Sequence, residues 1–107
     1  MIEVIYYRKN RRVTIKGHAH ADEPGKDLVC CSATTLALTL GSNVAMLEEK
    51  GWVRSATVRM DSGDAEICCT PSSHFKAIVD VIFSTVCIGF EQLALANPQY
   101  MRYEIHS

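Results

Sequence analysis

A chain of 107 residues has room for one hydrophobic core, so a single domain over residues 1–107 is expected. The hydrophobic fraction of 48% and the charged fraction of 21% are ordinary for a folded domain and exclude a disordered or fibrous chain. A formal net charge of -1 leaves no overall positive field to hold a polyanion, so a direct nucleic-acid partner is not expected.

The cysteines and the first residues favour a reducing compartment. The chain has five cysteines, an odd number that does not suit a framework of paired disulfides. The opening residues, Met1-Ile2-Glu3-Val4, lack the basic segment and apolar run of a secretion signal. We therefore expect a cytoplasmic protein whose thiols are reduced.

The first elements in chain order are predicted to form an antiparallel hairpin. Residues 2–7 and 12–18 are β-branched or alternating runs, which are typical of strands. The connection between them is basic, and its simplest interpretation is a solvated turn. Its charged residues are Arg8, Lys9, Arg11 and Arg12. Residues 19–26 are then predicted to be a loop, because they are acidic, contain proline and glycine, and show no regular period.

A long amphipathic helix is predicted from Asp27 onward. Its apolar residues recur at steps of three and four, the period of a helix with one buried face. They are Val29, Ala33, Leu36, Leu40, Val44 and Leu47. Asp27 is expected to be the N-cap, and Lys50-Gly51 supply a cationic last turn followed by a glycine that ends the helix.

The rest of the chain predicts a second hairpin, a second helix and a last strand. Residues 52–60 and 64–70 are typical of strands, and Asp61-Ser62-Gly63 between them is a hairpin turn signal. A helix over about residues 73–96 follows, and it ends before a proline. Residues 100–105 alternate as a strand.

The order ββαββαβ predicts the α+β class, with a mixed, mostly antiparallel sheet covered by two helices. The second helix is apolar around most of its circumference, more than one face of a sheet covers. Polar and charged residues interrupt it, so we interpret it as a buried helix and not as a membrane span. A homodimer that buries the surplus is the preferred explanation, and a larger core is the alternative.

The most reactive combination of residues is Cys30 with His18. Cys30 falls in the first turn of the predicted helix, where backbone amides and the helix dipole favour an anion and therefore a thiolate. His18 ends the preceding strand and is joined to Cys30 by a short loop. A histidine that takes the thiol proton and later donates it to a leaving amine is the minimum for acyl transfer. The amides that open the helix are expected to stabilise the oxyanion.

Two further residues belong to this candidate site. Asp27 has two possible roles, because its carboxylate either caps the helix or orients the His18 imidazolium. Thr34 lies one helical turn after Cys30 on the same face, where its hydroxyl contacts the thiol or the substrate, or else bonds its own backbone. Helical phase favours Cys30 over Cys31 as nucleophile, because Cys30 lies roughly 80° from the centre of the apolar stripe and Cys31 roughly 180°.

The cysteines and histidines have alternative uses. A zinc site is disfavoured, because structural zinc sites prefer thiols two or more residues apart. The relevant side chains are His18, His20, Cys30, Cys31, Cys68 and Cys69. In a strand, Cys68 and Cys69 point to opposite faces, so one is expected in the core and its neighbour outside. His20 is an alternative base to His18.

Gly17-His18-Ala19, followed after a short loop by Gly25-Lys26-Asp27-Leu28-Val29-Cys30, closely resembles the ribosomal-processing cysteine proteases called Prp. The resemblance covers the whole chain. It implies that His18 is the catalytic histidine, Cys30 the nucleophile and Asp27 the family's aspartate. It further implies a homodimer that needs no metal or cofactor.

The implied activity is removal of a short N-terminal extension from the twenty-seventh protein of the large ribosomal subunit, by a cut after a bulky aromatic residue. This chain departs from the family pattern at Cys31, where a small residue without a thiol is usual, and at Thr34, where serine is common. The alternative is a non-catalytic ribosome-associated assembly or binding factor with the same fold, because fold alone does not settle function. The basic turn would then be a surface that contacts the ribosome.

Overall fold

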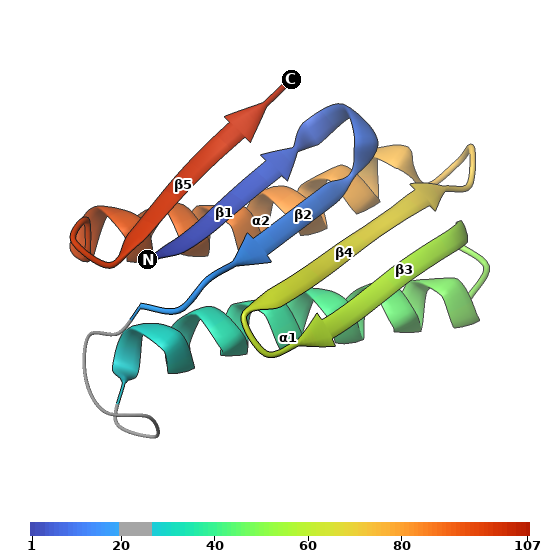
Figure 1. Ribbon diagram of the computed structural model, residues 1–107. Coiled ribbons are helices and arrows are strands. Elements are labelled where there is room, and N and C mark those ends of the chain that lie inside the picture. The colour runs from blue at the N-terminus through green and yellow to red at the C-terminus, as the bar shows by residue number, and fades with distance from the viewer. Residues whose placement is uncertain (20–26) are drawn as a thin grey trace.

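The computed structural model describes residues 1–19 and 27–107, and five strands in it form one mixed sheet. The strands are β1 (Ile2–Tyr7), β2 (Arg12–Lys16), β3 (Val53–Asp61), β4 (Asp64–Pro71) and β5 (Met101–His106). Their order across the sheet is β3-β4-β2-β1-β5, as Figure 1 shows. Only the β1–β5 pair is parallel, and the other neighbours are antiparallel. The predicted α+β class and the order ββαββαβ are confirmed.

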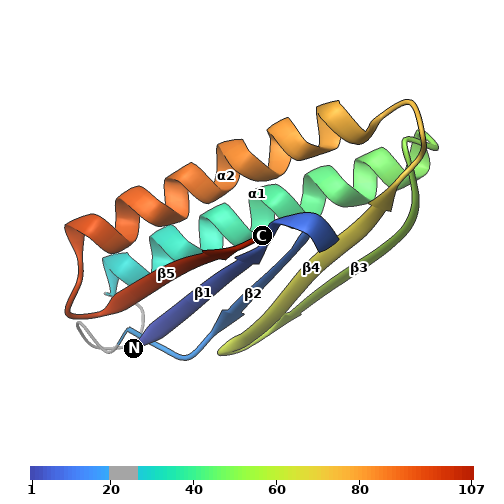
Figure 2. The same cartoon turned by 90° about the horizontal axis from the view of Figure 1, so that it is seen from above.

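Two long helices, α1 (Leu28–Glu49) and α2 (Lys76–Ala96), lie side by side on one face of this sheet (Figure 2). The strands alternate accordingly. In β1, for example, Ile2, Val4 and Tyr6 are buried under the helices, whereas Glu3 is on the opposite face, where it pairs with Arg102. The molecule is therefore a two-layer sandwich with one core.

The limits of α1 are those that the sequence predicts. Asp27 caps its start, and the helix ends at Glu49, followed by Lys50 as the C-cap and Gly51 at a φ of 76°. Its buried residues include Ala33, Leu40 and Val44. The first turn of this helix is consequently held in place by a side chain rather than left to fray.

Two predicted boundaries were wrong by a few residues. The second strand ends at Lys16 and does not reach His18, because Gly17 has a φ of 96° and turns the chain away from the sheet. The second helix begins at Lys76 and not near residue 73, because the Phe75 amide donates to the Ser72 carbonyl in a preceding turn. Both differences place a turn where a periodic pattern alone suggests that the element continues.

The sequence interpretation predicts that the basic connection between β1 and β2 is a solvated turn. The structure shows that one of its arginines is not free in solvent. Residues Arg8–Asn10 form a short 3-10 helix, and Arg11 follows it at a φ of 44°. The Arg11 guanidinium reaches α2 and donates to both carboxylate oxygens of Asp80, at 2.8 and 3.1 Å. This half-buried pair ties the first hairpin to the second helix.

The helices also keep apolar surface outside the core. Large apolar side chains on α2 remain exposed after it packs on the sheet, namely Ile78, Val81, Ile88 and Leu95. By length and composition alone both α1 and α2 would pass for membrane-crossing helices, a property that long core helices share. In this fold each of them contributes one buried face to the core beneath it.

Candidate active site

The first turn of α1 places Cys30 at the edge of the core, where its side chain is half-buried. The amides of Val29 and Cys30 each donate to Oδ1 of Asp27 at 3.0 Å, and Asp27 is itself buried. Of the two roles considered for Asp27, the structure thus shows the cap. The Cys31 amide donates to the Asp27 carbonyl at 3.0 Å, as in a regular helix.

These bonds overturn one expectation about the mechanism. Three of the amides that open the helix, those of Val29, Cys30 and Cys31, already have acceptors. An amide that is engaged by a buried carboxylate is not available to a developing negative charge. These three amides are therefore not free for an oxyanion.

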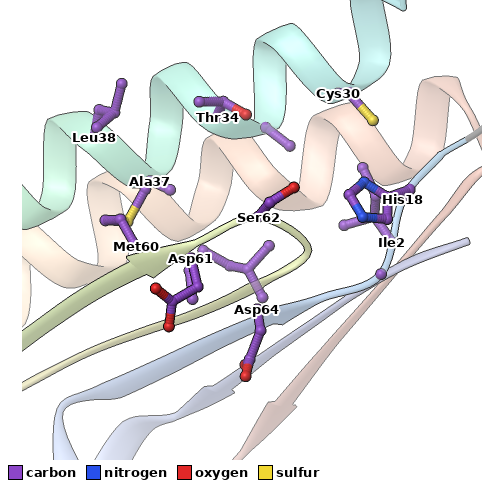
Figure 3. Close-up of a pocket in the computed structure, with 14 residues that line it drawn as sticks. Ile2, His18, Cys30, Thr34, Ala37, Leu38, Met60, Asp61, Ser62 and Asp64 are labelled. Atoms are coloured by element: carbon purple, nitrogen blue, oxygen red, sulfur yellow. The ribbon is translucent and has the colours of Figure 1, made fainter. Parts of the chain in front are cut away.

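The segment after β2 brings His18 to the same place as the thiol. The amide of Ala19, the next residue, donates to the Cys30 sulfur at 3.3 Å. Just before it, the Gly17 amide donates to the Gly63 carbonyl in the turn between β3 and β4, at 2.9 Å. In Figure 3 the Cys30 sulfur is directed from α1 toward the side on which the His18 ring lies.

His18 and Cys30 line one pocket of about 340 Å³ between α1 and the ends of the strands. Much of its wall is apolar, and is made by Ile2, Ile15, Ala33, Ala37, Leu38, Met60 and Ala65. Its polar side chains are His18, Cys30, Thr34, Asp61, Ser62 and Asp64. The pocket therefore combines an apolar surface for a side chain with a nucleophile and a base at its rim.

The other thiols are placed differently. Cys31 is exposed, next in the chain to Cys30 and outside the pocket lining. Cys68 is half-buried and Cys69 is buried, so the predicted orientation of this pair toward opposite faces is confirmed. Burial raises the pKa of Cys69 to about 11 and that of Cys87 to about 12. These two buried thiols are neutral at physiological pH and unsuited to nucleophilic attack.

The turn between β3 and β4 is the part of the site that the sequence interpretation missed. Ser62 and the flanking Asp61 and Asp64 line the pocket opposite α1, as Figure 3 shows. The sequence predicts this hairpin, but β4 pairs with β2, a strand far away in the chain. No local signal announces that pairing, and it alone brings the turn to His18.

Within residues 1–19 and 27–107, no three side chains of the histidine, cysteine, aspartate and glutamate types are grouped as metal ligands. His20, the alternative base, lies outside the described residues, as does most of the loop over residues 19–26.

A thiol and an imidazole on the rim of one apolar pocket are the parts that thiol-dependent acyl transfer requires. The fold and the site thus define a small α+β protein with the equipment of a cysteine hydrolase. Comparison with known families agrees: the model of the cysteine protease Prp family matches residues 1–102, so the chain belongs to that family. It is a cysteine protease.

Solved structures share the fold. The essential ribosomal processing protease Prp from S. aureus, with a covalently linked product peptide, has a TM-score of 0.70 at 17% identity, covering 98% of this chain and 97% of that one. The same protease with a substrate peptide has a TM-score of 0.65 at 16% identity, over 98% and 97%. SMU.848 from Streptococcus mutans has a TM-score of 0.66 at 25% identity, over 97% and 90%. No curated protein sequence matches the chain significantly.

Proposed function

We propose that this protease removes an N-terminal leader from the twenty-seventh protein of the large ribosomal subunit, in the cytoplasm, and so supports ribosome assembly. The observation that carries the proposal is the Cys30 thiol in the first turn of α1, on the same pocket as His18. The S. aureus neighbours are named ribosomal processing proteases and hold peptides, which supports a ribosomal substrate.

In the proposed reaction His18 takes the proton of the Cys30 thiol, and the sulfur attacks the carbonyl carbon of the scissile peptide bond. When the carbon–nitrogen bond breaks, His18 gives that proton to the leaving amine, and the leader remains bound as a thioester. A water molecule, deprotonated by His18, then attacks the thioester carbon, and the carbon–sulfur bond breaks. The leader leaves with a new carboxyl group, and His18 returns the proton to the Cys30 sulfur. No cofactor or metal is needed for these steps.

The oxyanion of this reaction needs donors that Asp27 does not occupy. The Ala19 amide, which points at the Cys30 sulfur, is one such donor. The side chains of Thr34 and Ser62, each with a hydroxyl, line the pocket that also contains His18 and Cys30. The proposal therefore assigns Thr34 a supporting role toward the substrate, and moves the oxyanion site from the helix amides to this rim.

The pocket also suits the cut after a bulky aromatic residue that the proposal requires. Its walls combine aliphatic side chains of β1, β2, β3 and β4 with small residues of α1, including Ala33 and Ala37. Small residues on a helix leave room for a large ring against the helix backbone. We assign this surface to the side chain that precedes the cut.

A homodimer is part of the proposal. On α2, Ile78, Val81, Ile88 and Leu95 are 44%, 64%, 58% and 69% exposed, and their spacing of three and seven residues sets them in one stripe. A stripe of this kind is self-complementary about a two-fold axis. A second copy of the chain is the occupant we assign to it.

A peptide that spans the leader and the mature N-terminus of that ribosomal protein tests the function. The wild-type protein should cut many equivalents of peptide at one bond. Cys30→Ala should abolish cleavage and leave the circular dichroism spectrum unchanged, whereas Cys31→Ala should retain activity. Binding of the peptide without any cut would favour the non-catalytic assembly factor. If only Cys31→Ala lost activity, the nucleophile would be Cys31 and not Cys30.

A further inference from the structure

We propose that Gly63, in the turn between β3 and β4, is a positioning residue for His18: the turn forms a seat that fixes the imidazole ring, and only glycine leaves space for it. The inference rests on the proposed role of His18 as the base. It concerns a residue that touches neither the thiol nor the scissile bond.

The contact is close along one whole edge of the ring. A Cβ atom at Gly63 would stand 2.5 Å from Nε2 of His18, 3.1 Å from Cε1 and 3.2 Å from Cδ2. The optimal separation of two non-bonded carbon atoms is about 3.5–4.0 Å, and all three distances are shorter than that. A side chain at position 63 and the ring in its present place therefore exclude each other.

The turn is anchored to the chain directly before the histidine. The Gly17 amide donates to the Gly63 carbonyl at 2.9 Å, one residue before His18. Gly17 has a φ of 96°, and a Cβ there would collide with the Met1 carbonyl oxygen. The backbone before His18 is thus held on both sides, so the turn and the backbone that carries the ring keep a fixed relation.

If the two groups collide, the His18 ring moves before the turn does. His18 is exposed, so its side chain rotates away more readily than the turn yields. A methyl group at Gly63 should therefore displace the imidazole while the fold persists. A shift of about 1 Å in a reacting group costs up to a hundredfold in rate.

The chain contains a matched control for this substitution. Gly51 has a φ of 76°, close to the 71° of Gly63, so an alanine suffers the same backbone strain at both positions. At Gly51, however, a Cβ would meet nothing within 4 Å. Comparing Gly63→Ala with Gly51→Ala thus separates the contact with His18 from the strain.

The experiment measures steady-state cleavage of the leader peptide and the NMR signals of the His18 ring without peptide. Gly63→Ala should shift the His18 ring signals and lower kcat by tenfold or more, with KM nearly unchanged. Gly51→Ala should change neither. Gly63→Asn and Gly51→Asn repeat the comparison with a residue that tolerates this backbone region, and they decide the matter where Gly63→Ala does not fold.

Three results would overturn the proposal. Unshifted ring signals in the folded Gly63 variants would show that the ring does not occupy the seat. Shifted signals with an unchanged kcat would show a contact that does not position the base. An equal loss in the Gly51 variants would assign the effect to backbone strain. A wild-type protein that cuts no peptide would instead defeat the proposed function, while the ring signals would still report on the seat.

Discussion

At the scale of single residues, Asp27 holds the helix turn that carries Cys30. Its carboxylate takes two amides of the first turn of α1, those of Val29 and Cys30. The thiol therefore sits on a helix whose start is rigid but whose amides are already used. Asp27 thus fixes the turn that carries the thiol.

We predict that Asp27→Ala lowers the free energy of unfolding by about 1 kcal/mol or more, because both capping bonds are lost and the position is buried. Asp27→Asn retains an oxygen that accepts the same amides, so its loss should be a fraction of that. Urea denaturation of the two variants and the wild type measures the difference. Equal destabilisation by alanine and asparagine would show that the charge, and not the cap, is what matters.

At the scale of secondary structure, α2 carries more apolar surface than the sheet covers. Its inward side holds Val79, Phe83, Cys87 and Phe90, all buried, while the stripe from Ile78 to Leu95 faces away from the core. Exposed stripes of this length on a helix mark an interaction surface more often than a monomer's ordinary exterior. We therefore assign the interface of the proposed homodimer to this one element.

Val81→Glu is predicted to convert the proposed dimer to a monomer, because it puts a carboxylate into the apolar stripe that the two copies would bury against each other. Met46→Glu on α1 is the matched control, since Met46 is a 43% exposed apolar residue outside α2 and should leave the dimer intact. Analytical ultracentrifugation gives the mass of each. A monomeric wild type, or dissociation by Met46→Glu alone, would remove α2 as the dimer surface.

At the scale of the whole molecule, the core contains titratable groups from two layers. Cys69 on β4 and Cys87 on α2 are both buried, and desolvation is the largest cause of their raised pKa values, about 11 and about 12 against an ordinary 9.0. Burial likewise raises the pKa of Tyr103 on β5. Each of these groups is held in its neutral form by folding, so each links stability to pH.

The free energy of unfolding should therefore fall as the pH rises above about 9. The unfolded thiols ionise near pH 9, whereas the folded ones keep their protons to about pH 11 and pH 12. Between those pH values the native state binds more protons than the unfolded chain. The contribution of the two thiols to the free energy of unfolding is therefore complete below pH 9 and is lost as the pH rises. The slope is at most about 1.4 kcal/mol per pH unit for each thiol.

Urea midpoints at pH 8, 9.5 and 10.5 check this prediction. Cys87→Ala creates a cavity and lowers stability at every pH, but it should reduce the slope against pH, because one of the linked protons is gone. An identical slope in the variant would mean that Cys87 ionises in the native state as readily as in the unfolded chain.

Much of this protein is determined by local patterns in the sequence. The element order, the cap at Asp27, the glycine that ends α1 and the flank position of Cys30 follow from helical and strand periods and from the chemistry of single residues. The structure confirms each of them, because short-range preferences and the core packing agree there. The shifted starts and ends at His18 and Lys76 come from turns that periodicity does not register.

Tertiary structure alone decided what surrounds the thiol. The pairing of β2 with β4 carries Ser62 and Gly63 to His18, and the β1–β2 connection finds its acidic partner on α2 at Asp80. Both relations join segments more than forty residues apart in the chain. Strand order across a sheet depends on the packing of all layers at once, and no local run of residues encodes it.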